Sequence, residues 1–257
     1  VYLDYAASTP VDPEIITAMN PYFSEIYANP SSTHTYGRNA LHAVENARKQ
    51  VSSCFHVDSD SICFTSGGTE ADNLALKGIA FQHSPKDRKK GPHIITSTIE
   101  HPAILQTCKQ LEEYGYKIAY LPVDETGLIN LEQLEETITQ DTLLVSIMYA
   151  NNEIGTIEPV EEIGKIAHEH DILFHTDAVQ AVGKIPIDLS KLPIDLLSLS
   201  SHKIYGPKGV GALYHKNDIT FDPLLEGGGH EKGKRSGTLN TPGIVGLGKA
   251  CELSKKR

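Results

Sequence analysis

The feature that most constrains the fold is an alternation of short apolar runs with longer segments of helical periodicity. The runs predict strands at Ser61–Thr65, His93–Ser97, Lys117–Leu121, Leu143–Met148, Ile172–His175, Leu196–Ser198 and Gly211–Tyr214. Helices are expected at Pro13–Tyr22, Arg38–Phe55, Ala71–Gln82, Pro102–Tyr114, Leu131–Thr139, Val160–His170 and Ile244–Lys256. Unbroken apolar strands that alternate with helices are typical of parallel sheets buried on both faces. The sequence therefore predicts an α/β fold with a mostly parallel, seven-stranded sheet.

One lysine stands where a predicted core strand ends. Lys203 follows the apolar run Ile194–Leu199, and a loop containing Gly206 and Pro207 comes after it. Desolvation at such a place lowers the pKa of an ammonium group, and a neutral amine can form a Schiff base with a carbonyl compound. The carbonyl of pyridoxal 5'-phosphate (PLP) is the obvious candidate. A loop lysine paired with a carboxylate is the alternative, and Lys203 alone does not decide between them.

An aspartate lies at the end of the preceding predicted strand. Asp177 follows Ile172–His175, and ligands in open α/β sheets gather at the carboxyl ends of strands. A PLP enzyme needs a carboxylate that keeps the pyridine nitrogen protonated. An N-cap on the following segment is the simpler reading of Asp177. Taken together with Lys203, the cofactor role is favoured.

A glycine turn supplies a candidate phosphate site. Ser66–Glu70 joins the strand that ends at Thr65 to the helix predicted from Ala71. Glycines let the backbone approach an anion, and the N–H groups and dipole at a helix start favour negative charge. The turn lacks the spacing of a Walker A loop or a GxGxxG fingerprint, so it fits a single phosphate better than a pyrophosphate. Alone, such a turn is often only a turn.

These segments belong to a longer series. The series consists of Tyr2–Ala7, Asn29–Ser32, Ser66–Glu70, Glu100–Pro102, Asn151–Gly155, His175–Gln180, Ser201–Gly209, Gly227–Glu231 and Arg235–Thr238. In this order the series resembles cysteine desulfurases of the NifS/IscS type, which are fold-type I PLP enzymes of the class-V aminotransferase family. The resemblance covers essentially the whole chain and implies the large domain of an aspartate aminotransferase-like fold.

The resemblance implies roles around the cofactor ring. Lys203 would hold PLP as a Schiff base and move the substrate α-proton, and Asp177 would pair with the pyridinium nitrogen. Gln180 would hydrogen-bond the pyridoxal hydroxyl. His101 would stack on the ring and serve as an acid or base, and Asn152 would lie beside cofactor and substrate. Outside this set, His101 would be one of 12 histidines and Asn152 a turn residue.

The resemblance also implies a phosphate-binding set. Gly68, Thr69, Ser200 and His202 would hold the phosphate within one subunit. Thr238 would reach the phosphate of a neighbouring subunit, which implies a homodimer with shared sites.

The implied activity is conversion of L-cysteine to L-alanine with the sulfur carried as an enzyme persulfide. That sulfur would feed iron–sulfur cluster assembly or tRNA thiolation, with a scaffold or sulfur-acceptor protein as partner. Two alternatives stay open. One is another reaction on the same fold, such as selenocysteine cleavage or transamination, because fold alone does not decide the reaction. The other is a PLP-binding fragment without activity of its own.

One departure from the family concerns the sulfur-accepting cysteine. In the family it lies on a loop beyond the segment that matches Arg235–Thr238, in a region with an arginine that grips the substrate carboxylate. We expect an N-terminal segment (1–15) and a PLP-binding large domain (16–257), with the C-terminal small domain absent. The four cysteines, Cys54, Cys63, Cys108 and Cys251, do not fall at the catalytic position. Buried structural cysteine is the expected state for such positions.

Composition agrees with a globular enzyme domain, with 39% hydrophobic and 22% charged residues. The net charge of −10 argues against a nucleic-acid partner, and the basic run Lys86–Lys90 predicts a solvated loop. The sequence shows neither an apolar run of membrane-spanning length nor a signal peptide, which predicts the cytoplasm. The mitochondrial matrix is the alternative if a targeting segment was removed. Without CxxC or HExxH spacing, no metal site is predicted.

Overall fold

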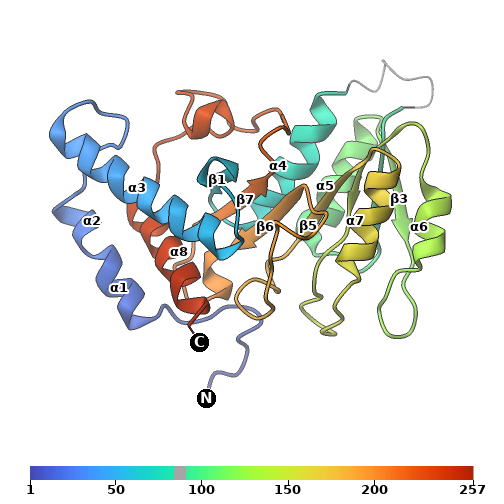
Figure 1. The fold of residues 1–257 in the computed structure, drawn as a ribbon, viewed down its shortest axis with the longest axis horizontal. Coiled ribbons are helices and arrows are strands. Elements are labelled where there is room, and N and C mark those ends of the chain that lie inside the picture. Colours follow the sequence, from blue (N-terminus) through green and yellow to red (C-terminus); the bar gives the residue numbers. More distant parts are fainter. Residues whose placement is uncertain (84–90, 257) are drawn as a thin grey trace.

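A seven-stranded sheet forms the centre of the molecule (Figure 1). The computed structural model describes residues 1–83 and 91–256, so the run Lys86–Lys90 lies outside the described residues. The strands are β1 (Ile62–Thr65), β2 (His93–Ser97), β3 (Lys117–Leu121), β4 (Thr142–Ser146), β5 (Leu173–Asp177), β6 (Leu196–Ser200) and β7 (Gly211–His215). They lie in the order β1-β7-β6-β5-β4-β2-β3. Among the described strands, β7 runs opposite to the other six, which confirms the predicted mostly parallel sheet.

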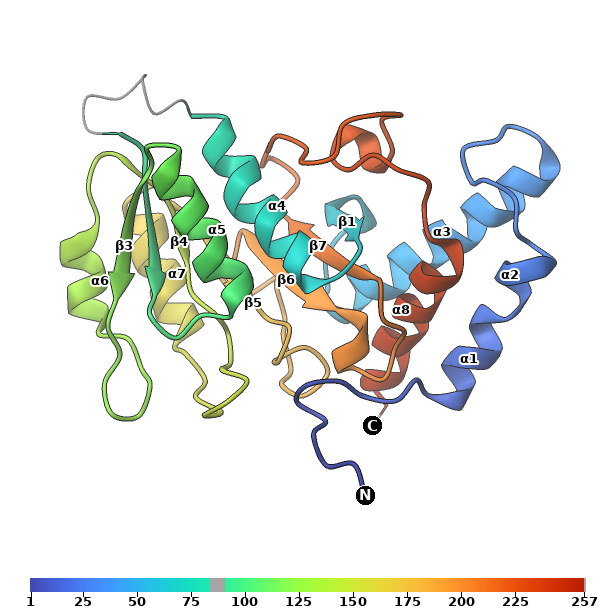
Figure 2. The same cartoon turned by 180° about the vertical axis from the view of Figure 1, so that it is seen from behind.

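Helices cover both faces of this sheet. They are α1 (Pro13–Met19), α2 (Pro21–Ser24), α3 (Thr35–Cys54), α4 (Gly68–Phe81), α5 (Pro102–Glu113), α6 (Leu131–Thr137), α7 (Val160–Glu169) and α8 (Thr241–Ser254), with 3-10 turns η1 (Ser59–Ser61), η2 (Ser201–Lys203) and η3 (Glu231–Gly233). Helices α3, α7 and α8 lie in front in Figure 1, and α4 and α5 lie in front in the reverse view of Figure 2. Each face has its own apolar core. Because most strand residues are buried, the strands read as continuous apolar runs in the sequence.

Helical periodicity explains how α3 packs. Its buried positions include Ala40, Val44, Ala47 and Val51, which recur at helical spacing and face α8 and the sheet. A Cβ atom placed on Gly248 of α8 would lie 2.7 Å from the Cα of Ala47. Only glycine therefore allows the two helices to approach this closely.

Several boundaries differ from the sequence-based expectation, with α3, α4 and α8 each beginning three residues earlier than predicted, and two further differences have a clear structural consequence. The helix predicted over Pro13–Tyr22 is two helices, because α1 ends at Met19 and α2 begins at Pro21. Proline has no backbone N–H and its ring clashes with the preceding turn, so it starts a helix more readily than it continues one. The strand predicted over Ile172–His175 extends to Asp177, which makes Asp177 its last residue.

The N-terminal segment crosses the carboxyl edge of the parallel strands. Thr9 donates hydrogen bonds to the carbonyl oxygen of His202 from both its backbone nitrogen (3.0 Å) and its hydroxyl (2.9 Å). In Figure 1 the chain start projects away from the fold, and the segment that leads from it to α1 passes below the sheet. This contact places the first residues of the chain over the strand ends.

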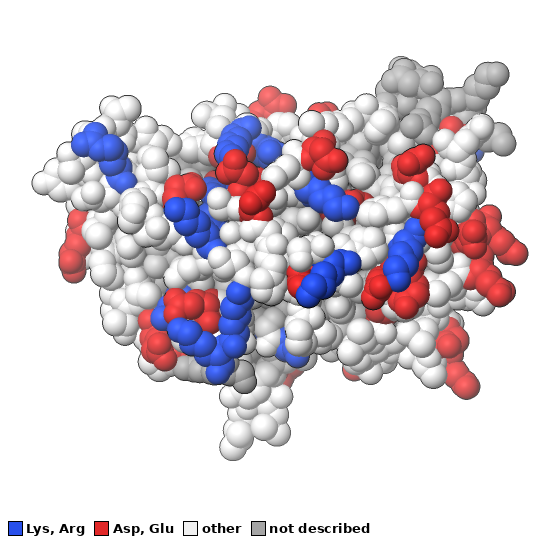
Figure 3. All heavy atoms as spheres, in the orientation of Figure 1, with Lys and Arg blue, Asp and Glu red and all other residues white. Residues whose placement is uncertain are grey.

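The surface carries mixed charge. Lys and Arg side chains are interspersed with Asp and Glu on the face shown in Figure 3, with acidic groups gathered toward the end of the molecule where α6 lies. Within residues 1–83 and 91–256, no helix is both long and apolar enough to cross a membrane.

Candidate active site

A cavity of about 550 Å³ opens at the carboxyl edge of β4, β5 and β6. We call it the Lys203 cavity. Its lining comes from the N-terminal segment, the first turns of α4, the start of α5, the segments after β4 and β5, and η2. The lining residues are Asp4, Ala6, Ala7, Gly68, Thr69, Asp72, His101, Met148, Ala150, Asn152, Glu153, Asp177, Val179, Gln180, Ser200, His202 and Lys203. Every site residue expected from the sequence is among them except Thr238.

Lys203 ends η2, directly after β6. Its Nζ donates hydrogen bonds to the backbone carbonyl oxygens of Ala6 (2.5 Å) and Ala7 (3.0 Å). Burial lowers the pKa of Lys203, while the negative charges of Asp177 and Asp4 act in the opposite direction. The sequence-based expectation of a lysine with a lowered pKa at a strand end is met, and its partners are carbonyl groups.

Asp177 lies at the end of β5, next to β6 in the sheet, and is 6% exposed. Its Oδ1 accepts a hydrogen bond from the backbone N–H of Val179 at 2.9 Å, within a turn rather than at the start of a helix. Asp177 also lines the cavity, so this local bond is compatible with the cofactor role expected for it. Burial raises its pKa, and the Val179 N–H together with the charges of His101 and Lys203 opposes that rise.

The first turn of α4 forms the candidate anion site. The helix begins at Gly68, and its N-cap residue Gly67 supplies no side-chain cap for the free N–H groups. Ser200 and His202 line the cavity with this turn. A Cβ on Gly68 would lie 2.7 Å from Cγ2 of Val179, so a side chain there would fill the space beside the N–H groups.

His101 is the N-cap of α5. Its Nδ1 accepts a hydrogen bond from the backbone N–H of Ala103 at 3.1 Å. An accepting ring nitrogen carries no proton, so the neutral imidazole is protonated at Nε2. The ring lies at the cavity mouth and is exposed. While this cap is formed, Nε2–H is the ring group free to act on a ligand.

Glu100 supports the cavity wall beside His101. Its Oε1 accepts hydrogen bonds from the Ser97 hydroxyl (2.7 Å) and from the backbone N–H of Met148 (2.9 Å). Its Oε2 is buried and has no hydrogen-bond partner in the described part of the chain. Burial raises the pKa of Glu100 to about 8.

Gln180 and the Asn151–Asn152 pair occupy the cavity rim. The Gln180 amide nitrogen donates to the Ala6 carbonyl oxygen at 2.8 Å, so it holds the N-terminal segment together with Lys203. Asn151 shapes the turn, because its Oδ1 accepts from the backbone N–H groups of Glu153 (2.8 Å) and Ile154 (3.0 Å). Asn152 is the one that lines the cavity.

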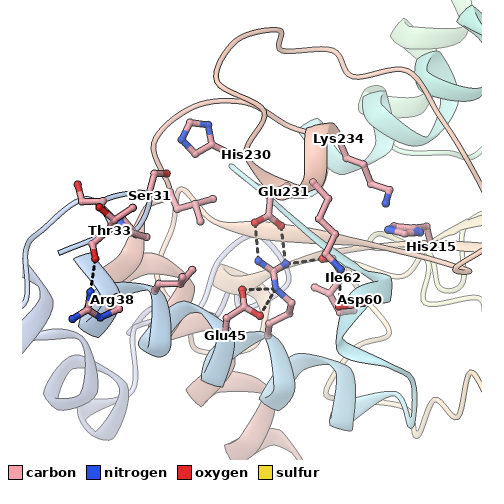
Figure 4. A pocket seen from close by; sticks show the side chains of 16 residues that line it. Ser31, Thr33, Arg38, Glu45, Asp60, Ile62, His215, His230, Glu231 and Lys234 are labelled. Atoms are coloured by element: carbon pink, nitrogen blue, oxygen red, sulfur yellow. Dashed lines mark hydrogen bonds and ion pairs between the residues drawn. The ribbon is translucent and has the colours of Figure 1, made fainter. Parts of the chain in front are cut away.

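Thr238 lies outside the Lys203 cavity and is exposed. Its segment borders a second cavity of about 510 Å³, which we call the Arg48 cavity (Figure 4). There Arg48 donates to both carboxylate oxygens of Glu231, at 2.7 and 2.8 Å, and to the carbonyl oxygen of Ile62 at 2.7 Å. Glu231 also accepts from the backbone N–H of Phe64 at 2.8 Å. These bonds join α3, β1 and the segment of Thr238.

The whole chain, residues 1–257, matches the family model of the class-V aminotransferases. The chain belongs to this family. It is 55% identical over 254 residues to a cysteine desulfurase IscS of Methanosarcina thermophila, an alignment that covers 99% of this chain and 62% of that protein. A cysteine desulfurase IscS of Dictyoglomus turgidum is 53% identical, with 99% and 64% covered. The chain thus spans less than two thirds of the length of these curated relatives.

Solved structures agree with this membership. A NifS-like protein superimposes with a TM-score of 0.95 and 45% identity, covering all of this chain and 70% of that one. A structure of SspA in complex with cysteine gives a TM-score of 0.94 and 47% identity, with 98% and 72% covered. The fold is therefore that of the NifS-like fold-type I enzymes.

Sequence reasoning missed two parts of the Lys203 cavity. The first is the pair of carbonyl groups of Ala6 and Ala7, which a sequence pattern cannot show because they act through the backbone. The second is Asp72, which follows the glycine turn and is 1% exposed. A signal for Asp72 was present: it is a carboxylate among the apolar, core-facing positions of α4.

Proposed function

We propose that this chain forms the PLP-binding large domain of a cysteine desulfurase, which converts L-cysteine to L-alanine and passes on the sulfur. The observation that carries the proposal is the arrangement of Lys203 and Asp177 at the ends of adjacent parallel strands, in one cavity with the uncapped start of α4. An amine, a buried carboxyl group and an anion site in one cavity are the groups that PLP requires.

The residues present fit this cofactor. The Lys203 amine would hold the aldehyde carbon, Asp177 the pyridine nitrogen, and the α4 turn the phosphate, with Thr69, Ser200 and His202 alongside. The space beside Gly68, which a Cβ would fill, supports the phosphate assignment. When bound, PLP supplies an electron sink that stabilises negative charge at the substrate Cα.

The chain's own groups then have distinct tasks. Lys203 would take and return the proton at the substrate Cα, which its lowered pKa favours. Asp177 would keep the pyridine nitrogen protonated. His101 would stack on the ring and offer its Nε2–H to the substrate, and Gln180 and Asn152 would orient cofactor and substrate by hydrogen bonds.

The oligomeric state, the domain bounds, the sulfur acceptor and the compartment are also proposals. Thr238 is exposed and could serve a neighbouring subunit in a homodimer. We place the N-terminal segment at 1–15 and the large domain at 16–257. An iron–sulfur scaffold or another sulfur-acceptor protein would receive the sulfur, in the cytoplasm.

One observation favours a second candidate. None of the four cysteines lines the Lys203 cavity: Cys63, Cys108 and Cys251 are buried, and Cys54 borders a different cavity. This favours a PLP-binding unit that does not complete sulfur transfer by itself. Another reaction of the same family, such as selenocysteine cleavage or transamination, would use the same cofactor groups.

The absorbance spectrum of the purified chain with added PLP tests the proposal. The spectrum is recorded before and after addition of L-cysteine and a thiol reductant, and sulfide and alanine are assayed in the same samples. We expect a band of bound cofactor that is lost in Lys203→Ala and kept in the matched control Lys208→Ala, a lysine on the exposed side of the same loop. Cofactor binding with both products supports the desulfurase. Binding without sulfide supports the binding unit, and a keto acid supports transamination. No Lys203-dependent band would contradict all three.

A further inference from the structure

A buried polar network adjoins the Lys203 cavity, which its member Asp72 lines, and the function proposed above assigns it no role. Its members are Asp72 on α4, His175 on β5, and the hydroxyl groups of Ser146 on β4 and Ser198 on β6. His175 stands two residues before Asp177, so both side chains project from the same face of β5. The network therefore lies directly behind the carboxyl group proposed to hold the pyridine nitrogen.

His175 is fully buried and satisfied without a charge. Its Nδ1 lies 2.9 Å from the Ser146 hydroxyl and its Nε2 lies 3.0 Å from the Ser198 hydroxyl. A hydroxyl group can donate or accept, so a neutral imidazole is matched on both sides. Burial lowers the pKa of His175 to about 3, so the ring is neutral at physiological pH.

Asp72 forms no ion pair with a lysine or arginine within residues 1–83 and 91–256. Its Oδ1 is buried without a hydrogen-bond partner within the described residues, and the nearest basic atom is Nε2 of His175 at 3.8 Å. Its carboxyl group lines the same cavity as Asp177. Burial raises the pKa of Asp72 well above its ordinary value, the charges of Asp177 and Glu100 add to the rise, and the Ser198 hydroxyl opposes it.

The two carboxyl groups differ in what faces them. Asp177 faces Lys203 from η2 and His101 from the start of α5, and it accepts the N–H of Val179. Asp72 faces Asp177 and the neutral His175 from β5, Glu100 from the segment before α5, and Ser198 from β6. Two carboxyl groups that share a buried site do not both ionise at ordinary cost, so one proton stays in the pair.

We propose that Asp72 carries this proton at neutral pH and is a positioning residue, which leaves Asp177 as the one charged carboxylate in the cavity floor. The role of Asp177 rests on the proposed function, whereas the position of the proton does not. A neutral Asp72 removes the charge repulsion that would otherwise favour protonation of Asp177. Asp177 must be charged to hold a protonated pyridine nitrogen.

Carbon-13 NMR of the cofactor-free chain labelled at the aspartate carboxyl carbon tests the proton directly. Glutamates are silent in this experiment, so Glu100 does not interfere. We expect one aspartate resonance to keep the shift of a protonated carboxyl group at pH 7 and to vanish in Asp72→Asn but not in Asp177→Asn. If all aspartates show carboxylate shifts at pH 7, or if the protonated resonance vanishes in Asp177→Asn alone, the proposal is overturned.

The PLP-loaded chain tests the positioning role. Asn at position 72 imitates a protonated aspartate, so Asp72→Asn should bind PLP with nearly unchanged affinity between pH 6 and 8. A loss of about tenfold or more, equal to one pKa unit of interaction, would contradict it. Failure of the Lys203 test with a protonated Asp72 in the NMR spectrum would overturn the proposed function and this positioning role, but not the place of the proton.

Discussion

The Lys203 cavity and the Arg48 cavity have similar volumes, about 550 and 510 Å³, and both contain buried charged groups. In the Arg48 cavity the deepest charges satisfy each other, because Arg48 and Glu231 form a bidentate ion pair. In the Lys203 cavity, within the described part of the chain, neither Asp72 nor Asp177 forms an ion pair with a lysine or arginine. The difference suggests that a cavity's function is better judged from its unbalanced groups than from its size or charge.

The Arg48 cavity also differs from the Lys203 cavity in holding strained backbone. Glu231 and Lys232 adopt left-handed conformations with φ of 49° and 57°, which cost non-glycine residues about 1–2 kcal/mol each. The bonds of Glu231 to Arg48 and to the Phe64 N–H hold this conformation in place. A second ion pair, from Arg235 Nε to Glu70 at 2.8 Å, ties the same segment to the first turn of α4. The Arg48 cavity therefore organises the segment that carries Thr238.

Breaking the buried pair should have the largest effect on stability. Arg48→Met leaves the Glu231 carboxylate buried without its partner, and removing one member of such a pair costs about 3–5 kcal/mol. Urea unfolding should show this loss, and Arg48→Met with Glu231→Gln should recover most of it. Lys203→Met makes the matching change in the Lys203 cavity and should change the free energy of unfolding little. An Arg48→Met loss below about 1 kcal/mol would show that the pair is not a structural anchor.

Beside the Lys203 cavity, Glu100 should make the stability of the protein depend on pH. The pKa of Glu100 is raised to about 8, so the folded state binds a proton that the unfolded state releases near pH 4.5. Stability from this group is full below the unfolded pKa and falls as pH rises to about 8, by at most about 1.4 kcal/mol per pH unit. Glu100→Gln keeps an acceptor for Ser97 and Met148 and should flatten the decline. Parallel profiles for the two proteins between pH 5 and 8 would count against a protonated Glu100.

A smaller effect is expected from filling the anion site. In Gly68→Ala the new methyl group meets Cγ2 of Val179 at 2.7 Å, so the neighbour must move. Such overpacking costs about 1–3 kcal/mol and should also weaken binding of inorganic phosphate, measured by calorimetry. The double variant Gly68→Ala with Val179→Ala is the control, because it removes the clash. Unchanged phosphate affinity in Gly68→Ala would argue against an anion site at this turn.

The smallest effect is expected at a surface pair. Lys165 and Glu161 lie one turn apart on α7, with 2.6 Å between Nζ and Oε1, and both are exposed. Lys165→Ala should cost about 0.3–0.5 kcal/mol, and added salt should screen the contribution. A cost as large as that of Arg48→Met would mean that burial is not what separates the two ion pairs.

The sequence predicted the sheet because strands depend on local patterns, and the residues it proposed for a cofactor, most of them from the family resemblance, line one cavity except Thr238. Unbroken apolar runs marked the strands, and Lys203 and Asp177 each stand where a run ends. Contacts between distant residues could not be read in this way. The Arg48–Glu231 pair joins positions 183 residues apart, and only the folded chain shows that each charge has its partner. The sequence marks Asp72 as a carboxylate among core-facing positions, but only the folded chain shows that β5, β6 and the segment before α5 surround it.

The N-terminal segment over the cavity has a consequence for biosynthesis. The Thr9 hydroxyl bonds to the carbonyl oxygen of His202, 193 residues later, and the Ala6 carbonyl receives Lys203 from 197 residues away. At about 5–20 residues per second, a ribosome needs about 10–40 seconds to supply these partners. During that time the segment around Ala6 and Thr9 lacks these two native contacts. A chaperone that recognises extended peptides with unpaired backbone groups would therefore find this segment without its partners, and truncated translation products should engage it until Lys203 has emerged.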